Sequence, residues 1–177
     1  MSAGEISAVF LDRDGVINEK APEGEYVTEW GAFRFLPGAL DGLALLASLG
    51  APVIVATNQR GIARGAMSEE DLADIHRQML EQVEAAGGRI DAIYHCPHEG
   101  GCDCRKPLPG MYERAAREHG LDLRRSAVIG DRRSDMDAAA AVGARGMLVL
   151  ASGERPLPGE EVAEDLLSAA RLLAAAA

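Results

Sequence analysis

The sequence predicts an α/β protein built on a parallel sheet of about five strands. Short apolar runs bounded by turn residues are each followed by a helical pattern, and this alternation is typical of parallel α/β construction. A chain of 177 residues with 47% hydrophobic and 26% charged residues has the composition of a soluble globular protein with one core. Because no repeat, linker or composition shift interrupts the chain, we expect one domain over residues 1–177.

The predicted strands are short, continuously apolar segments, as a sheet covered on both faces requires. Turn residues bound each segment, which favours a strand over a longer buried helix. The five predicted strands are Ser7–Asp12, Pro52–Thr57, Ile90–His95, Ala127–Asp131 and Gly146–Leu150.

Helices are predicted in the gaps between these strands. A helix opens at Pro37 and ends at Gly50, since proline is favoured at a helix start and glycine at its end. Ser68 with Asp71 three residues later resembles a capping box, which predicts a helix from there to Gly88. Three further helices are expected near residues 109–119, 134–142 and 159–175.

The segment between Asn18 and Leu36 has no clear periodicity. It is long enough to be a functional loop beside the first strand. It is too short to form a separate lid domain.

The charge balance excludes some classes of partner. Eighteen basic and 28 acidic residues give a formal charge of -10, which disfavours the broad basic surface that nucleic-acid binding needs. No apolar run of eighteen residues appears, and the N-terminus lacks a basic segment followed by a long apolar one. We therefore predict a cytoplasmic protein without a membrane partner.

Polar residues follow three of the predicted strands. Asp12 and Asp14 end the first, Thr57 and Asn58 the second, and Asp131 the fourth. In a parallel sheet these carboxyl ends emerge at one edge, where ligands bind in open α/β folds. Each pattern alone also fits a solvated strand end or a turn, but together they predict a site in which two carboxylates share a cation.

Asp135 lies one helical turn after Asp131, and Lys106 follows the cysteine-rich segment. One of the two aspartates is placed to bind a cation and the other to orient it. Taken alone, Asp135 also fits a helix N-cap or a surface charge, and Lys106 also fits a solvated surface residue.

All three cysteines lie within ten positions. Cys96 and His98, then Cys102 and Cys104, form two pairs at i and i+2, so each pair can point to one side of an extended segment. Three sulfurs and one nitrogen make a closed tetrahedral zinc site. His95 is the alternative imidazole, and buried free thiols are the alternative reading of the cluster, although its glycine-rich surroundings offer no core.

In chain order, DRDGV, VATN, RKP and VIGDRRSD resemble the four motifs of the haloacid dehalogenase superfamily of phosphotransferases. FLDRDGVIN, TNQRGIARG, CDCRKPLPGM and GDRRSDM are most similar to the D-glycero-D-manno-heptose 1,7-bisphosphate 7-phosphatases, with histidinol-phosphate phosphatases as near relatives. The resemblance covers residues 8 to about 150. It implies a doubly wound (Rossmann-like) parallel sheet, magnesium dependence, no large cap domain and a zinc-bound loop.

The resemblance also implies catalytic roles. Asp12 is the expected nucleophile, which forms an aspartyl phosphate, and Asp14 is the expected general acid and then base. Magnesium is expected on Asp12, Asp131 and the backbone carbonyl of Asp14, with Asp135 in support.

The implied substrate is a small phosphorylated sugar. Thr57, Asn58 and Lys106 are expected on the transferring oxygens. Arg60 departs from the family, which commonly has a small hydroxyl residue there. The short Glu99–Gly101 insert leaves the preferred anomer open. The full set of expected substrate contacts is Arg13, Tyr26, Thr57, Asn58, Gln59, Arg60, Arg105, Lys106 and Arg132.

Other functions also fit parts of this sequence. A histidinol-phosphate phosphatase would use carboxylates against a cationic substrate, and Glu19, Glu23 or Glu25 in the loop after the first strand supply them. A catalytically inactive zinc-stabilised interaction module and a phosphorylated receiver-like domain are the alternatives from another class. We expect a monomer that binds magnesium and zinc.

Overall fold

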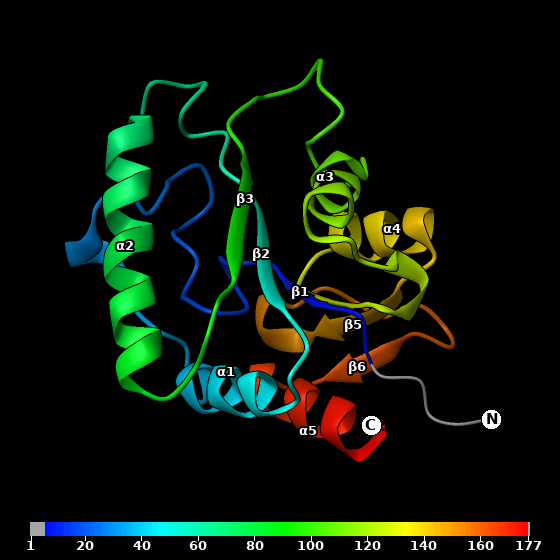
Figure 1. The fold of residues 1–177 in the computed structure, drawn as a ribbon. Helices are drawn as coiled ribbons and strands as arrows, with labels where there is room; N and C mark the ends of the chain where they lie inside the picture. Colours follow the sequence, from blue (N-terminus) through cyan, green and yellow to red (C-terminus); the bar gives the residue numbers. More distant parts are fainter. Residues whose placement is uncertain (1–5, 177) are drawn as a thin grey trace.

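The computed structural model describes residues 6–176 and contains one parallel sheet, shown in Figure 1. Its strands are β1 (Val9–Leu11), β2 (Val53–Asn58), β3 (Ala92–Cys96), β4 (Ala127–Gly130), β5 (Arg145–Val149) and β6 (Glu161–Ala163). They lie in the order β3-β2-β1-β4-β5-β6, and every neighbouring pair is parallel. The order reverses at β1, so the ends of β1, β2 and β4 form the switch point of the sheet.

Helices cover both faces of the sheet. α1 (Ala39–Ser48), α2 (Glu69–Ala85) and α5 (Leu166–Ala176) pack on one face, while α3 (Gly110–His119) and α4 (Arg133–Val142) pack on the other. The doubly wound parallel architecture that the family resemblance implies is therefore confirmed.

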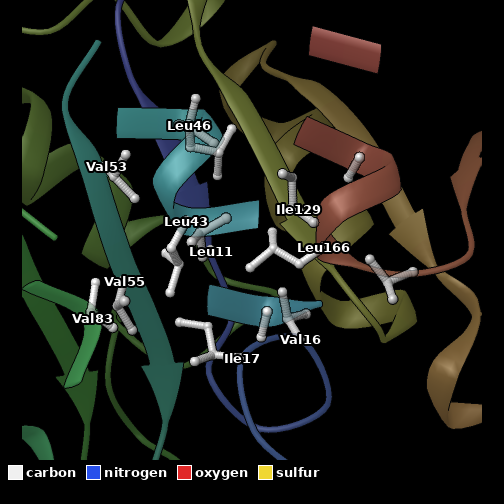
Figure 2. Close-up of a cluster of buried hydrophobic side chains, with 14 of the residues drawn as sticks. Leu11, Val16, Ile17, Leu43, Leu46, Val53, Val55, Val83, Ile129 and Leu166 are labelled. Atoms are coloured by element: carbon white, nitrogen blue, oxygen red, sulfur yellow. The ribbon is translucent and has the colours of Figure 1, made fainter. Parts of the chain in front are cut away.

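The core divides between the two faces because alternate side chains of a strand point to opposite sides. Val9 and Leu11 face the cluster that contains Leu43, Leu46 and Leu166, part of which is drawn in Figure 2. Phe10, which lies between them, points to the other face. There it belongs to a second cluster with Val128, Met111, Tyr112 and Ala138. Two apolar layers thus fix β1, and with it the residues that follow β1.

The five predicted strands are confirmed, with ends within two residues of those observed. The capping box is also confirmed: Asp71 N donates to Ser68 Oγ at 3.1 Å, and Ser68 N donates to Asp71 Oδ2 at 2.8 Å.

The predicted helix over 159–175 is wrong in its first part. Residues 161–163 form β6, which pairs with β5, and α5 begins only at Leu166. Asp165 starts this helix, since its Oδ1 accepts from Ser168 N at 2.7 Å.

The segment after β1 is a loop with one 3-10 turn, Trp30–Ala32, and no lid domain. Trp30, Phe33 and Phe35 pack their rings against one another and so fix the loop to the core. Among residues 6–176 no helix is both long and apolar enough to cross a membrane. The N-terminal segment 1–5, on which the expectation of no targeting sequence partly rests, lies outside the described residues.

Candidate active site

The polar strand ends predicted from the sequence lie together at the carboxyl edge of the sheet. Asp12 follows β1, Asn58 ends β2 and Asp131 follows β4. The chain turns sharply at Gly15, whose φ is +90°. A Cβ at this position would lie 2.2 Å from Asp131 Oδ2, so only glycine lets the loop after β1 approach Asp131.

Three carboxylates gather at this edge. Asp12, Asp131 and Asp135 each offer an oxygen, and the three oxygens lie within 4.8 Å of one another. Asp131 is fully buried, and its Oδ1 accepts no hydrogen bond from the residues that the structure describes. Asp135 Oδ2 accepts from the backbone N of Asp131 and Arg132 at 3.2 and 3.1 Å. Crowded oxygens with a free acceptor fit a hard divalent cation such as magnesium.

Lys106 lies inside this cluster as a fixed cation. Its Nζ is 3.0 Å from Asp12 Oδ1 and 2.6 Å from Asp135 Oδ1, and it donates to the carbonyl of Ala56 at 2.7 Å. Asn58 also fixes the backbone of Lys106: Asn58 Oδ1 accepts from Lys106 N at 3.0 Å, and Asn58 Nδ2 donates to Lys106 O at 3.1 Å. Burial lowers the pKa of Lys106, but the two carboxylates outweigh burial and raise it above its ordinary value, so the ammonium stays charged.

Without a divalent ion, the environment of Asp12 favours its protonated form, even with Lys106 beside it. Burial raises the pKa of Asp12 to about 8; Lys106 opposes this, while Asp135 and Asp131 add to it. A divalent cation on the same oxygens would restore the carboxylate. The donor set at the strand edge therefore suits both a nucleophile and a metal ligand.

Asp14 lies apart from the three clustered carboxylates. Its Oδ1 accepts from Arg13 and from Asn18 at 2.9 Å, and its Oδ2 accepts from Gln59 at 2.8 Å. Burial raises its pKa, but the charge of Arg13 and these hydrogen bonds hold the pKa of Asp14 below its usual value. Its side chain remains 26% exposed. Asp14 is therefore fixed in direction and still open to the site.

Arg13 does not fit the prediction that it contacts the substrate, because its side chain is 0% exposed. Its Nη2 donates to Asp14, and its Nη1 lies 3.2 Å from His76 Nε2 on α2. The guanidinium lies over the Phe33 ring, with Arg13 Cζ 5.9 Å from the ring centroid. Arg13 instead positions Asp14 and is itself supported by His76.

The Arg13–His76 pair predicts a pH effect on stability. Burial, with the charges of Arg13 and His95, lowers the pKa of His76 to about 3 from 6.5. The unfolded chain therefore binds the proton more readily, so the stabilisation present above pH 6.5 is lost as the pH falls. Between pH 7.5 and 5, urea titrations should show the wild type losing about 2 kcal/mol more unfolding free energy than His76→Gln. Equal losses in the two proteins would contradict this assignment of the imidazole.

The remaining predicted substrate residues differ in burial and in the contacts they make. Thr57 is buried, and its Oγ1 accepts from Gln59 Nε2 at 3.0 Å. Tyr26 OH accepts from Arg64 at 3.2 Å, and Arg64 also pairs with Glu99, so the loop after β1 contacts the residues after β2 and the cysteine-rich loop. Arg60 and Arg105 are half-buried and Arg132 is exposed.

The cysteine cluster has the geometry of a four-ligand metal site. Cys96 Sγ lies 3.1 Å from Cys104 Sγ and 3.6 Å from Cys102 Sγ, and His98 Nδ1 lies 3.3 Å from Cys104 Sγ. Zinc–sulfur bonds of about 2.3 Å in a tetrahedron place sulfurs roughly 3.7 Å apart. The cysteines form no disulfide. Four convergent ligands with these separations fit zinc.

His95, the alternative imidazole, points elsewhere. Its Nε2 lies 2.8 Å from Glu69 Oε2 at the start of α2. It is absent from the group of four possible metal ligands, Cys96, His98, Cys102 and Cys104. The geometry therefore favours His98.

Replacing Cys102 by serine should weaken zinc retention without unfolding the sheet. Arg105 and Lys106 follow Cys104 directly, so a loosened loop displaces them, and we expect kcat to fall by about 10²-fold. Metal analysis after gel filtration in reducing buffer without chelator measures zinc retention, far-ultraviolet circular dichroism shows whether the fold is kept, and phosphate release gives kcat. His95→Gln is the matched control and should keep one zinc per chain. If wild-type protein prepared in this way held no zinc, the site would be refuted.

Three residues near the site were not found from the sequence: Asn18, Lys20 and His76. Asn18 is fully buried and donates to Asp14 Oδ1 and to the Glu19 carbonyl at 2.9 Å. The spacing Asp14-x-x-x-Asn18 around a glycine turn was the available signal for it. Lys20 pairs with Asp131, and His76 lies on the apolar face of α2; nothing local in the sequence indicates either contact.

Comparison with known proteins identifies the family. A family model described as "HAD-hyrolase-like" matches residues 103–170. The D-glycero-beta-D-manno-heptose-1,7-bisphosphate 7-phosphatase of Bordetella bronchiseptica is 41% identical over 93% of this chain and 96% of that protein. The D-glycero-alpha-D-manno-heptose-1,7-bisphosphate 7-phosphatase of Campylobacter jejuni is 43% identical over 74% of each chain.

A solved structure shares this arrangement over most of the chain. The crystal structure of the D,D-heptose 1,7-bisphosphate phosphatase from B. bronchiseptica, complexed with magnesium and phosphate, superposes with a TM-score of 0.89 at 37% identity. The match covers 97% of this chain and 99% of that chain. With the strand-edge carboxylates and the cysteine cluster in place, this protein belongs to the heptose-1,7-bisphosphate 7-phosphatase family of HAD-like hydrolases.

Proposed function

We propose that this protein is a magnesium-dependent phosphatase that removes the 7-phosphate of D-glycero-D-manno-heptose 1,7-bisphosphate. The observation that carries the proposal is the pairing of two differently held carboxylates: Asp12 in the cation cluster and Asp14 on Arg13, Asn18 and Gln59. The relatives named above act on this substrate, and they support its identity here.

The first step transfers the phosphoryl group to Asp12. A carboxylate oxygen of Asp12 forms a bond to phosphorus, and the bond between phosphorus and the sugar oxygen breaks. Asp14 donates a proton to the departing oxygen. The approaching phosphate brings negative charge close to Asp14, which raises its pKa and favours the protonated form that the step needs.

The second step hydrolyses the aspartyl phosphate. Asp14, now a carboxylate, removes a proton from a water molecule, and the water oxygen attacks phosphorus. Inorganic phosphate leaves and Asp12 is regenerated. The hydrogen bonds from Arg13, Asn18 and Gln59 keep Asp14 in place for both steps.

Positive charge near the transferring group stabilises both steps. Lys106 is within 3.0 Å of Asp12, so its ammonium lies where phosphate oxygens arrive, with Thr57 and Asn58 at the neighbouring strand end. Magnesium held by Asp12, Asp131 and the carbonyl of Asp14, with Asp135 in support, would neutralise the repulsion between nucleophile and phosphate.

We further infer that zinc on Cys96, His98, Cys102 and Cys104 is structural, since four protein ligands leave no position for an activated water. The single domain over residues 1–177, the monomeric state and the cytoplasmic location stay predictions.

Kinetics with three substrates test the proposed function. The alpha and beta anomers of the heptose bisphosphate should each be hydrolysed with a kcat/KM well above that of histidinol phosphate, and the ratio between the anomers gives the preferred one. Phosphate should be released from carbon 7 alone, as phosphorus NMR of the product shows. A kcat/KM highest for histidinol phosphate would replace the proposed function by that of the near relatives.

A further inference from the structure

Lys20 reaches from the loop after β1 into the carboxylate cluster. Its Nζ forms an ion pair with Asp131 Oδ2, and Asp131 itself is fully buried. The approach depends on Gly15, because a Cβ there would lie 2.6 Å from Lys20 Cε. The Lys20 side chain is 23% exposed, so it runs from solvent to a buried carboxylate.

The two lysines of the chain are held very differently. Lys106 contacts oxygens of Asp12, Asp135 and Ala56, and its peptide is fixed by Asn58. Among residues 6–176, the only oxygen partner of the Lys20 ammonium is Asp131. Lys106 is therefore a permanent cation of the site, whereas Lys20 can leave by rotating its partly exposed side chain toward solvent.

Charge balance indicates what happens when a divalent ion binds. In the site with a divalent ion bound, where Asp12, Asp131 and Asp135 are all ionised, the three carboxylates exceed the charge of the two lysines by one negative unit. A divalent ion added beside Lys20 leaves an excess of one positive unit, whereas an ion that replaces Lys20 leaves the cluster neutral. Because charges in a buried site interact strongly, replacement is favoured over addition.

We propose that Lys20 is an exchangeable counter-cation of Asp131, which competes with the divalent ion for this carboxylate and thereby sets the affinity of the site for magnesium. The inference rests on the proposed function in one respect, namely that Asp12 and Asp131 bind the divalent ion. It assigns to Lys20 a function in metal binding and none in phosphoryl transfer.

Removal of the Lys20 ammonium therefore has two opposite effects. Without magnesium, Asp131 loses its partner and becomes an unpaired buried charge, so the fold is destabilised. With magnesium, the ion no longer has to displace a competitor, so it binds more tightly. A lysine with a purely structural function would give only the first effect.

The test measures magnesium binding directly, in the absence of substrate. Lys20→Met keeps the apolar stem and removes the charge, and Lys20→Arg keeps the charge. Arg117→Gln, on the exposed side of α3, is the control for an equal change of net charge away from the site. Calorimetric titration with magnesium, repeated with manganese followed by electron paramagnetic resonance, gives the dissociation constants.

We expect the magnesium dissociation constant of Lys20→Met to fall by about tenfold, while those of Lys20→Arg and Arg117→Gln stay near the wild-type value. In magnesium-free buffer, with zinc content verified, Lys20→Met should unfold about 3 °C below the wild type, and saturating magnesium should remove this difference. Unchanged or weaker magnesium binding by Lys20→Met overturns the proposal. Failure of the wild type itself to bind a divalent ion overturns the proposed function instead, so the two are distinguishable.

Discussion

We expect Asp12→Asn to reduce kcat by about 10⁴- to 10⁶-fold. An amide oxygen is a poor nucleophile toward phosphorus, and the neutral side chain also weakens the pairing with Lys106 and the binding of the divalent ion. The fold should survive, because asparagine has the same shape and removes one negative charge from a crowded cluster. Continuous measurement of phosphate release from the heptose bisphosphate, with residue 12 verified by mass spectrometry, gives the rate.

Asp41→Asn is the matched control, since it makes the same chemical change at an exposed position of α1. It should retain wild-type kcat and KM. Turnover by Asp12→Asn within tenfold of the wild type, from protein of verified mass, would remove Asp12 as the nucleophile and with it the covalent mechanism.

The strands could be predicted because each central strand is buried on both faces and its sequence is therefore continuously apolar. β6 lacks this signal. It is an edge strand of three residues, Glu161–Ala163, and only Ala163 is buried. Its acidic and alanine-rich surroundings are equally suited to a helix, and the prediction extended α5 through it. Residues 161–163 form a strand because they pair with β5, and this tertiary contact leaves no signal in the local sequence.

The positions of Asp12, Asp14 and Asp131 could be predicted because each is a local property of a strand end. The metal-site geometry of Cys96, His98, Cys102 and Cys104 also follows from close spacing within one loop. The same reasoning failed for Arg13. Its burial depends on His76, 63 residues further along the chain, and on the loop that carries Phe33. An arginine between two aspartates has the sequence appearance of a substrate contact, and only packing shows that it supports Asp14.

Asp14→Asn should lower kcat for the sugar bisphosphate by about 10²- to 10⁴-fold. The carboxamide accepts the hydrogen bonds of Arg13 and Asn18, and Gln59 can turn its amide to match, so the side chain stays in place. What is lost is the ability to give and take a proton. Phosphoryl transfer to Asp12 needs the proton of Asp14 only if the leaving group is strongly basic. Hydrolysis of the aspartyl phosphate needs Asp14 as a base whatever the leaving group was.

Two substrates separate these two steps. With p-nitrophenyl phosphate, whose leaving group is weakly basic, Asp14→Asn should transfer the phosphoryl group to Asp12 and then stop, because no base activates water. A burst of about one nitrophenol per chain, together with a phosphate mass on the peptide that contains Asp12, is the expected observation. With the sugar bisphosphate the burst should be absent, since the first step is also slow. Steady nitrophenol release at the wild-type rate, without a trapped phosphate, would show that the proton leaves the attacking water by another route and that Asp14 has only a binding function.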